Sequence, residues 1–144
     1  MEVSKNIKRF VISVIIAAIF MMVASFVWHG LILNDFRNIT VAFPLFILLS
    51  FLVYFSISAV LNFILFKLDF TDHFTTKRML IGGIMGFGIY LLVFTLGLSY
   101  GERGMKHILI DFGWQMSEQG IGALVVDFML HIYNRADKFE TSEE

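Results

Sequence analysis

The chain has 144 residues, of which 58% are hydrophobic and 16% charged, with a mean hydropathy of +0.79 and a formal net charge of −1. A soluble domain is closer to half apolar and about a quarter charged, so this composition excludes an ordinary soluble domain and indicates a membrane protein. The net charge argues against nucleic acid as a partner, and the absence of cysteine excludes disulfides and thiolate metal sites.

Four long apolar runs account for nearly the whole chain. Residues 10–33, 38–66 and 79–101 contain no Asp, Glu, Lys or Arg, and each run exceeds the roughly 20 residues that cross about 30 Å of hydrocarbon as a helix. The fourth run, 108–133, is apolar but carries charged residues. The predicted fold is therefore all-α, a single integral-membrane domain over residues 1–144. We expect a four-helix bundle with spans at about 10–33, 42–66, 79–100 and 108–133, and a short polar tail at 134–144.

Lysine and arginine set the predicted orientation, because their excess marks the cytoplasmic side. Eight of the 11 lie in the N-terminal segment, the connector between spans two and three, and the tail, whereas three lie on the other side. Both termini are therefore expected in the cytoplasm. The predicted location is the bacterial cytoplasmic membrane, with the lipid bilayer as a partner. The first run exceeds the roughly 7–15 apolar residues of a signal peptide, so it is interpreted as a retained span.

Polar residues mark the first two spans. The first span ends in Trp28-His29, and Ser25 lies one turn before His29 on the same face. The second span has polar residues every four positions, which are Ser50, Tyr54, Ser58 and Asn62. In lipid, such a stripe favours hydrogen bonds between helices, worth about 1 kcal/mol each, over the lining of a transport pathway.

The third span carries a glycine stripe. Gly82, Gly86 and Gly97 fall within about a third of the helix circumference. Gly82-x-x-x-Gly86 is a close-packing motif, because the missing side chains let two helix backbones approach each other. These glycines therefore predict a tight helix contact.

The fourth span is the chief indication of function. Asp111, Trp114 and Glu118 lie within about 100° on one face of the predicted helix. Asp111 lies in the first outer turn, within reach of water or headgroups. Glu118 lies about 15 Å into the span, at roughly mid-bilayer depth, where a carboxylate costs a few kcal/mol and must be protonated, paired or hydrated. Asp127 and His131, four residues apart, are expected to form an ion pair near the cytoplasmic end.

The first span ends on the side where the fourth begins. The residues expected to converge there, around one outward-facing site for a ligand or a proton, are His29, Asp35, Asp111, Trp114 and Glu118. A structural hydrogen-bonded cluster, a small-molecule, lipid or ion site, and a divalent-cation site all stay open. The spacings match no metal-site signature, so no metal and no other cofactor is assigned. His29 is the expected partner of Glu118 across the bundle.

One segment resembles a known pattern. Trp28-His29, followed after five residues by Asp35-Phe36, is similar to the end of the first span in small bacterial four-span membrane proteins of unknown function. The resemblance covers residues 28–36, implies the same four-span layout and brings no known activity.

Three functions are compatible with these features. A non-catalytic bundle or accessory subunit, assembled as a homo-oligomer or with a partner membrane subunit, fits the small size and the glycine stripe, and it is the favoured hypothesis. A small ion- or proton-coupled transporter would use Glu118 as its intramembrane carboxylate. An intramembrane enzyme acting on lipids or quinones would use His29 and Glu118 as an acid–base pair. No nucleophile motif supports the enzyme, and no catalytic residue is assigned.

Overall fold

The computed structural model describes residues 2–34, 36, 42–67, 75–95 and 105–140. They form four long helices, α1 (Glu2–Phe26), α2 (Phe43–Lys67), α3 (Thr75–Thr95) and α4 (Met105–Glu140). A six-residue π-helical segment, η1 (Val27–Ile32), extends α1. The all-α prediction is confirmed. The helix α4 continues past the predicted span into the polar segment at 134–144 and ends at Glu140.

Local chemistry explains two of the helix ends. The N–H of Leu33 donates to the carbonyl oxygen of Trp28 at 2.9 Å, which closes the wide turn of η1. Asn34 follows with a φ of 58°, a left-handed conformation in which Asn is enriched and which a helix cannot continue. Pro44 lies in the first turn of α2, where its fixed φ and missing N–H suit the start of a helix.

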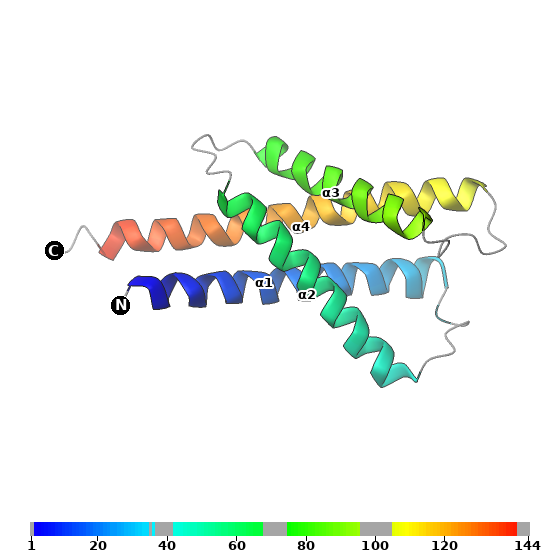
Figure 1. Ribbon diagram of the computed structural model, residues 1–144, viewed down its shortest axis with the longest axis horizontal. Helices are drawn as coiled ribbons and strands as arrows, with labels where there is room; N and C mark the ends of the chain where they lie inside the picture. Colours follow the sequence, from blue (N-terminus) through cyan, green and yellow to red (C-terminus); the bar gives the residue numbers. More distant parts are fainter. Residues whose placement is uncertain (1, 35, 37–41, 68–74, 96–104, 141–144) are drawn as a thin grey trace.

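Successive helices run in opposite directions, and the two ends of the chain lie at the same end of the bundle (Figure 1). α1 and α4 lie side by side, α2 crosses them obliquely, and α3 packs along α4. The contact between α3 and α4 is the most extensive, α1 contacts both α2 and α4, and α2 barely touches α3. The outer end is defined here as the end of the bundle that holds η1 and the start of α4, and the inner end as the end that holds both chain termini.

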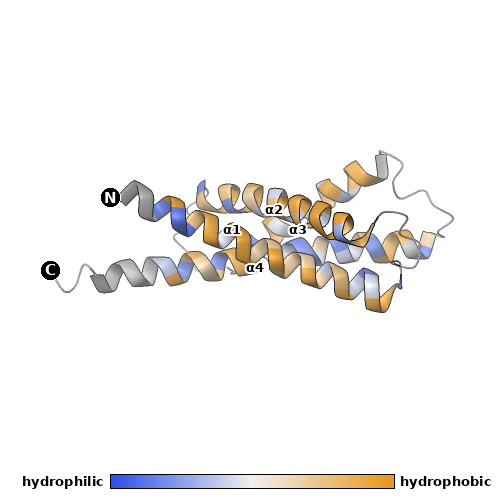
Figure 2. Ribbon diagram, turned by 90° about the horizontal axis from the view of Figure 1, so that it is seen from below, coloured by the Kyte–Doolittle hydropathy of each residue, from blue (hydrophilic) through white to orange (hydrophobic). Residues whose placement is uncertain are grey.

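Three of the described helices are long and apolar enough to cross a membrane, over Asn6–Ile32, Phe43–Lys67 and Thr76–Val93. Large hydrophobic side chains such as Leu31, Phe66 and Leu80 are exposed along them, and most of the residues of α1 and α2 are hydrophobic in Figure 2. A contiguous apolar surface of this extent is typical of a face that meets lipid. The fourth predicted span, 108–133, lies within α4, but α4 is not among the three apolar helices.

The core lies where α1, α2 and α4 meet. Its fully or nearly fully buried members are Ala17, Leu61, Leu65, Ala123 and Val126. The two alanines leave little side-chain bulk between the backbones, so α1 and α4 can approach closely.

A second part of this interior is polar and completely hydrogen-bonded. The hydroxyl of Ser13 in α1 donates to Oδ1 of Asn62 at 2.7 Å, and the hydroxyl of Ser58 donates to the carbonyl oxygen of Val14 at 2.9 Å. The amide of Asn62 donates to the carbonyl oxygen of Ser58 at 3.0 Å. For Ser58 and Asn62, the predicted hydrogen bonding between helices is therefore confirmed.

Glycines set the spacing of α3 and α4. Gly82 and Gly86 are buried against the α4 backbone. A Cβ atom on Gly86 would lie 2.5 Å from the carbonyl oxygen of Gln115, and one on Gly82 would meet the carbonyl oxygen of Gln119. Any larger residue at either position would push the helices apart, which is the arrangement that the Gly82-x-x-x-Gly86 spacing indicates. Gly97 lies outside the described residues.

Candidate functional site

The predicted site residues lie on two elements that meet at the outer end. His29 belongs to η1, whereas Asp111, Trp114 and Glu118 belong to the first half of α4 (Figure 1). His29 and Asp111 are both half-buried. Asp35 lies outside the described residues.

Two tryptophans join η1 to α4. The rings of Trp28 and Trp114 stack with centroids 4.3 Å apart and planes 4° apart. A stacked aromatic pair contributes about 0.5–1.5 kcal/mol beyond its buried area. The indole N–H groups of both residues are buried, and neither donates a hydrogen bond within the described part of the chain. The stack therefore joins η1 to α4 at the outer end of the bundle.

Glu118 is the most deeply buried charged residue that the structure describes, with 2% of its surface exposed. The hydroxyl of Tyr54 in α2 and the indole of Trp114 approach its carboxyl group closely enough to interact with it. Neither carboxyl oxygen, however, accepts a hydrogen bond of standard geometry from any described residue. The expected pairing of Glu118 with His29 is therefore not seen, and the geometry lends the acid–base pair of the enzyme hypothesis no support.

Gln119, the next residue along α4, repeats this pattern. Its side chain is fully buried, and both its amide oxygen and its amide nitrogen lack hydrogen-bond partners among the described residues. An unsatisfied buried polar group costs about 1–3 kcal/mol, and native interiors contain few of them. Two adjacent buried residues with polar atoms that lack standard hydrogen bonds therefore make this level of α4 the candidate site.

Tyr54 connects this level of α4 to the rest of the bundle, and the sequence did not identify it as a site residue. Its hydroxyl interacts with Glu118 and with the hydroxyl of Ser25 in α1. The available signal was the polar stripe of α2, where Tyr54 lies one turn from Ser50 and one from Ser58. The stripe predicted a polar face on α2 but did not indicate which helix packs against that face.

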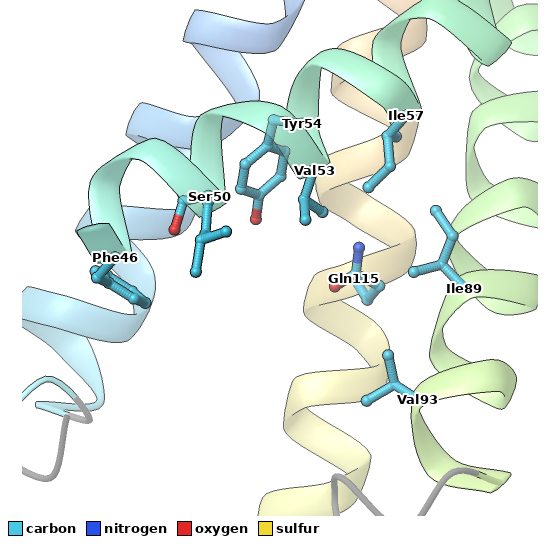
Figure 3. Close-up of a pocket in the computed structure, with 9 residues that line it drawn as sticks. Phe46, Ser50, Val53, Tyr54, Ile57, Ile89, Val93 and Gln115 are labelled. Atoms are coloured by element: carbon cyan, nitrogen blue, oxygen red, sulfur yellow. The ribbon is translucent and has the colours of Figure 1, made fainter. Parts of the chain in front are cut away.

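A groove runs between α2 and α3 beside Tyr54, with α4 along its floor (Figure 3). Its volume is about 320 Å³, and its lining residues are Phe46, Leu49, Ser50, Val53, Tyr54, Ile57, Ile89, Val93 and Gln115. Tyr54 and Gln115 extend from α2 and α4 into the space between the helices. Most of the lining is apolar, and the polar groups are contributed by three side chains.

Aromatic packing fixes the outer end of α2. The rings of Phe26, Phe36 and Phe46 are in mutual contact, with centroids 5.3 to 5.7 Å apart. Phe36 also covers Gly30, where a Cβ atom would lie 2.7 Å from its ring. The trio ties the end of α1 to the start of α2, so Phe46 has a defined position at the groove.

At the inner half of α4, Asp127 forms a salt bridge with Arg78 of α3. Both side chains are mostly buried, with 20% and 17% of their surfaces exposed. The sequence had paired Asp127 with His131 on the same helix, and that contact stays a prediction. The Arg78 pair adds an electrostatic link to the glycine contact between α3 and α4.

The described residues contain no group of three or more His, Asp or Glu side chains placed to hold a metal ion. No protein-family model, curated protein or solved structure matches the chain. The resemblance of residues 28–36 to small bacterial four-span proteins therefore stays a prediction.

Proposed function

We propose that this chain is a small multi-pass membrane protein that binds and exchanges a proton or another cation at Glu118, and that it works as an ion-coupled carrier. One observation carries the proposal, the burial of a carboxyl group whose two oxygens lack hydrogen-bond partners among the described residues. An ionised carboxylate in such a place costs several kcal/mol unless a cation compensates it. Binding and release of a cation therefore have a direct energetic consequence at this position.

The sequence supplies no permanent cation at the depth of Glu118. Residues 10–33, 38–66 and 79–101 contain no Lys or Arg, and neither does 107–134. The compensating charge has to be a proton or a cation from outside the chain. A purely structural cluster would satisfy its own hydrogen bonds, as Ser13, Ser58 and Asn62 do. This contrast supports the carrier over the non-catalytic bundle or accessory subunit.

The chain provides its own reporter for a test. It has only two tryptophans, and they stack on each other beside Glu118. We expect their fluorescence in the purified protein in phosphatidylcholine nanodiscs to change with pH, and we expect Glu118→Gln to abolish that transition. Asp111→Asn and His29→Gln are the controls, because both residues are titratable and lie near the same end of the bundle. If the fluorescence of Glu118→Gln still changed with pH as in the unmodified chain, the pH transition would belong to another group and the proposal would lose its basis.

The membrane topology is part of the same proposal. We place all four helices across the bacterial cytoplasmic membrane with both termini inside. The common position of the chain ends (Figure 1) and the positive charges near them support this orientation. The chain has no cysteine, so single-cysteine variants can be labelled without background. A membrane-impermeant maleimide should label Leu31→Cys in intact cells and should label Lys67→Cys only after permeabilisation. The reverse pattern would invert the topology.

A further inference from the structure

The groove between α2 and α3 has the properties of a ligand site. Its volume of about 320 Å³ lies at the lower end of the range of about 300–1,000 Å³ for small-molecule sites, which combine apolar walls with a few placed polar groups. The walls come from α2 and α3, two helices that are apolar enough to cross a membrane. A ligand dissolved in the hydrocarbon layer could therefore enter sideways.

Two polar side chains of the groove come from different helices. Gln115 contributes an amide and Tyr54 a hydroxyl, and both point into the space between the helices (Figure 3). Gln115 lies one turn before Glu118 on α4. The Tyr54 hydroxyl both lines the groove and interacts with the Glu118 carboxyl group. A polar head group beside Tyr54 in the groove would thus be separated from the Glu118 carboxyl group by the Tyr54 side chain.

Charge selects the class of ligand. The three apolar runs bring no Lys or Arg to this depth, and neither Glu118 oxygen accepts a hydrogen bond of standard geometry from the described residues. The complementary head is a cation that carries several N–H donors, and the complementary tail is an unbranched hydrocarbon that fits between α2 and α3. We propose that the groove binds a single-chain lipophilic amine in its ammonium form, with its chain along Ile89 and Val93 and its head at Gln115 and Tyr54.

This inference rests on cation exchange at Glu118 and names the exchanged cation. An ammonium head at Gln115 and Tyr54 is a positive charge close to the Glu118 carboxyl group and favours its ionised form. Binding of the ammonium ion therefore releases one proton from the carboxyl group to the solvent, so charge and protons balance. Tyr54 is the titratable group that faces Glu118 from α2. At this depth, α1 and α3 contribute no Asp, Glu, Lys or Arg. The proton released should therefore come from Glu118.

The experiment uses decylamine, which is an ammonium ion at neutral pH, with decanol and decanoate as matched neutral and anionic probes. The full-length protein is held in phosphatidylcholine nanodiscs, with empty nanodiscs as the blank. We expect decylamine to change the tryptophan fluorescence saturably and to release protons into weakly buffered solution. We expect decanol and decanoate to bind at least tenfold more weakly. Equal binding of decanol and decylamine would overturn the charge argument.

Two variants on neighbouring positions of α3 locate the site. Val93→Phe fills the groove, whereas Leu92→Phe adds the same ring on an exposed position outside it. We expect Val93→Phe to weaken decylamine binding at least tenfold while leaving the pH transition of the tryptophans in place, and we expect Leu92→Phe to bind as the unmodified chain does. Equal decylamine binding by both variants would refute the groove as the binding site. A pH transition without decylamine binding would overturn this inference and leave the proposed function standing, whereas loss of both would remove the two together.

Discussion

A single methyl group at Gly82 tests how closely α3 and α4 must pack. The added Cβ atom in Gly82→Ala would lie 2.8 Å from the Cβ atom of Ala123 and closer still to the carbonyl oxygen of Gln119. That oxygen belongs to the α4 backbone, so no change of side-chain rotamer relieves the contact. The helices must separate by roughly 1 Å, because carbon contacts are optimal at about 3.5–4.0 Å.

The magnitude follows from two opposing effects. Overpacking of an interior costs about 1–3 kcal/mol, and replacing Gly by Ala within a helix returns about 1 kcal/mol. The net expectation for Gly82→Ala is a loss of about 0–2 kcal/mol in the free energy of unfolding. Gly88 in the same helix is exposed, and a Cβ atom there would meet nothing within 4 Å. Gly88→Ala should therefore be neutral or stabilising by up to about 1 kcal/mol.

The assay is a titration of each purified variant with sodium dodecyl sulfate in mixed micelles, followed by the loss of helical circular dichroism. Gly82→Ala should unfold at a lower detergent fraction than the unmodified chain, and Gly88→Ala at the same or a higher one. The two variants share the substitution and the helix, so only the packing differs between them. Equal stabilities would refute the close approach of α3 to α4.

The same titration tests two further contacts. Asn62→Ala removes the acceptor of the buried Ser13 hydroxyl and should cost about 1–3 kcal/mol in the free energy of unfolding. Ser56→Ala removes an exposed hydroxyl that is bonded within α2 and should change this free energy by less than about 0.5 kcal/mol. A comparable loss in both variants would contradict the hydrogen bonding of Asn62 between α1 and α2. Arg78→Met and Asp127→Leu should each be destabilising because each removes one partner of a mostly buried salt bridge, and the double variant should be more stable than either single variant. Additive losses in this double-mutant cycle would show that the pair is not coupled.

Features that depend on one helix could be predicted from the sequence. The second span was expected at 42–66, and α2 covers Phe43–Lys67, because hydropathy and the turn residues around the helix act locally. The role of Gly82 and Gly86 also followed from spacing along one helix. The predicted span at 108–133 covers the apolar part of α4, which continues through polar turns to Glu140. Hydropathy marks where lipid contact ends and not where a helix ends.

Features that depend on two helices were predicted incompletely. Glu118 was expected to meet His29, but its neighbours are Trp114 and Tyr54. That outcome is set by the oblique crossing of α2 over the bundle, which no pattern within α2 encodes. The π-helical segment η1 changes the rotation of the residues at the end of α1, so Trp28 stacks on Trp114. Asp127 has a partner on α3, Arg78, that no pattern within α4 indicates.

The two polar clusters of this bundle differ in a way that assigns them different roles. The cluster of Ser13, Ser58 and Asn62 is buried and hydrogen-bonded, and with the α3–α4 glycine contact it stabilises the fold. The level of Glu118 and Gln119 is equally buried but has unused polar atoms, so it lowers stability by itself. Such a local cost is expected at functional or strained sites, which is consistent with the proposed cation site at Glu118. The groove beside this level is lined by α2, α3 and α4, and α2 has few contacts with α3.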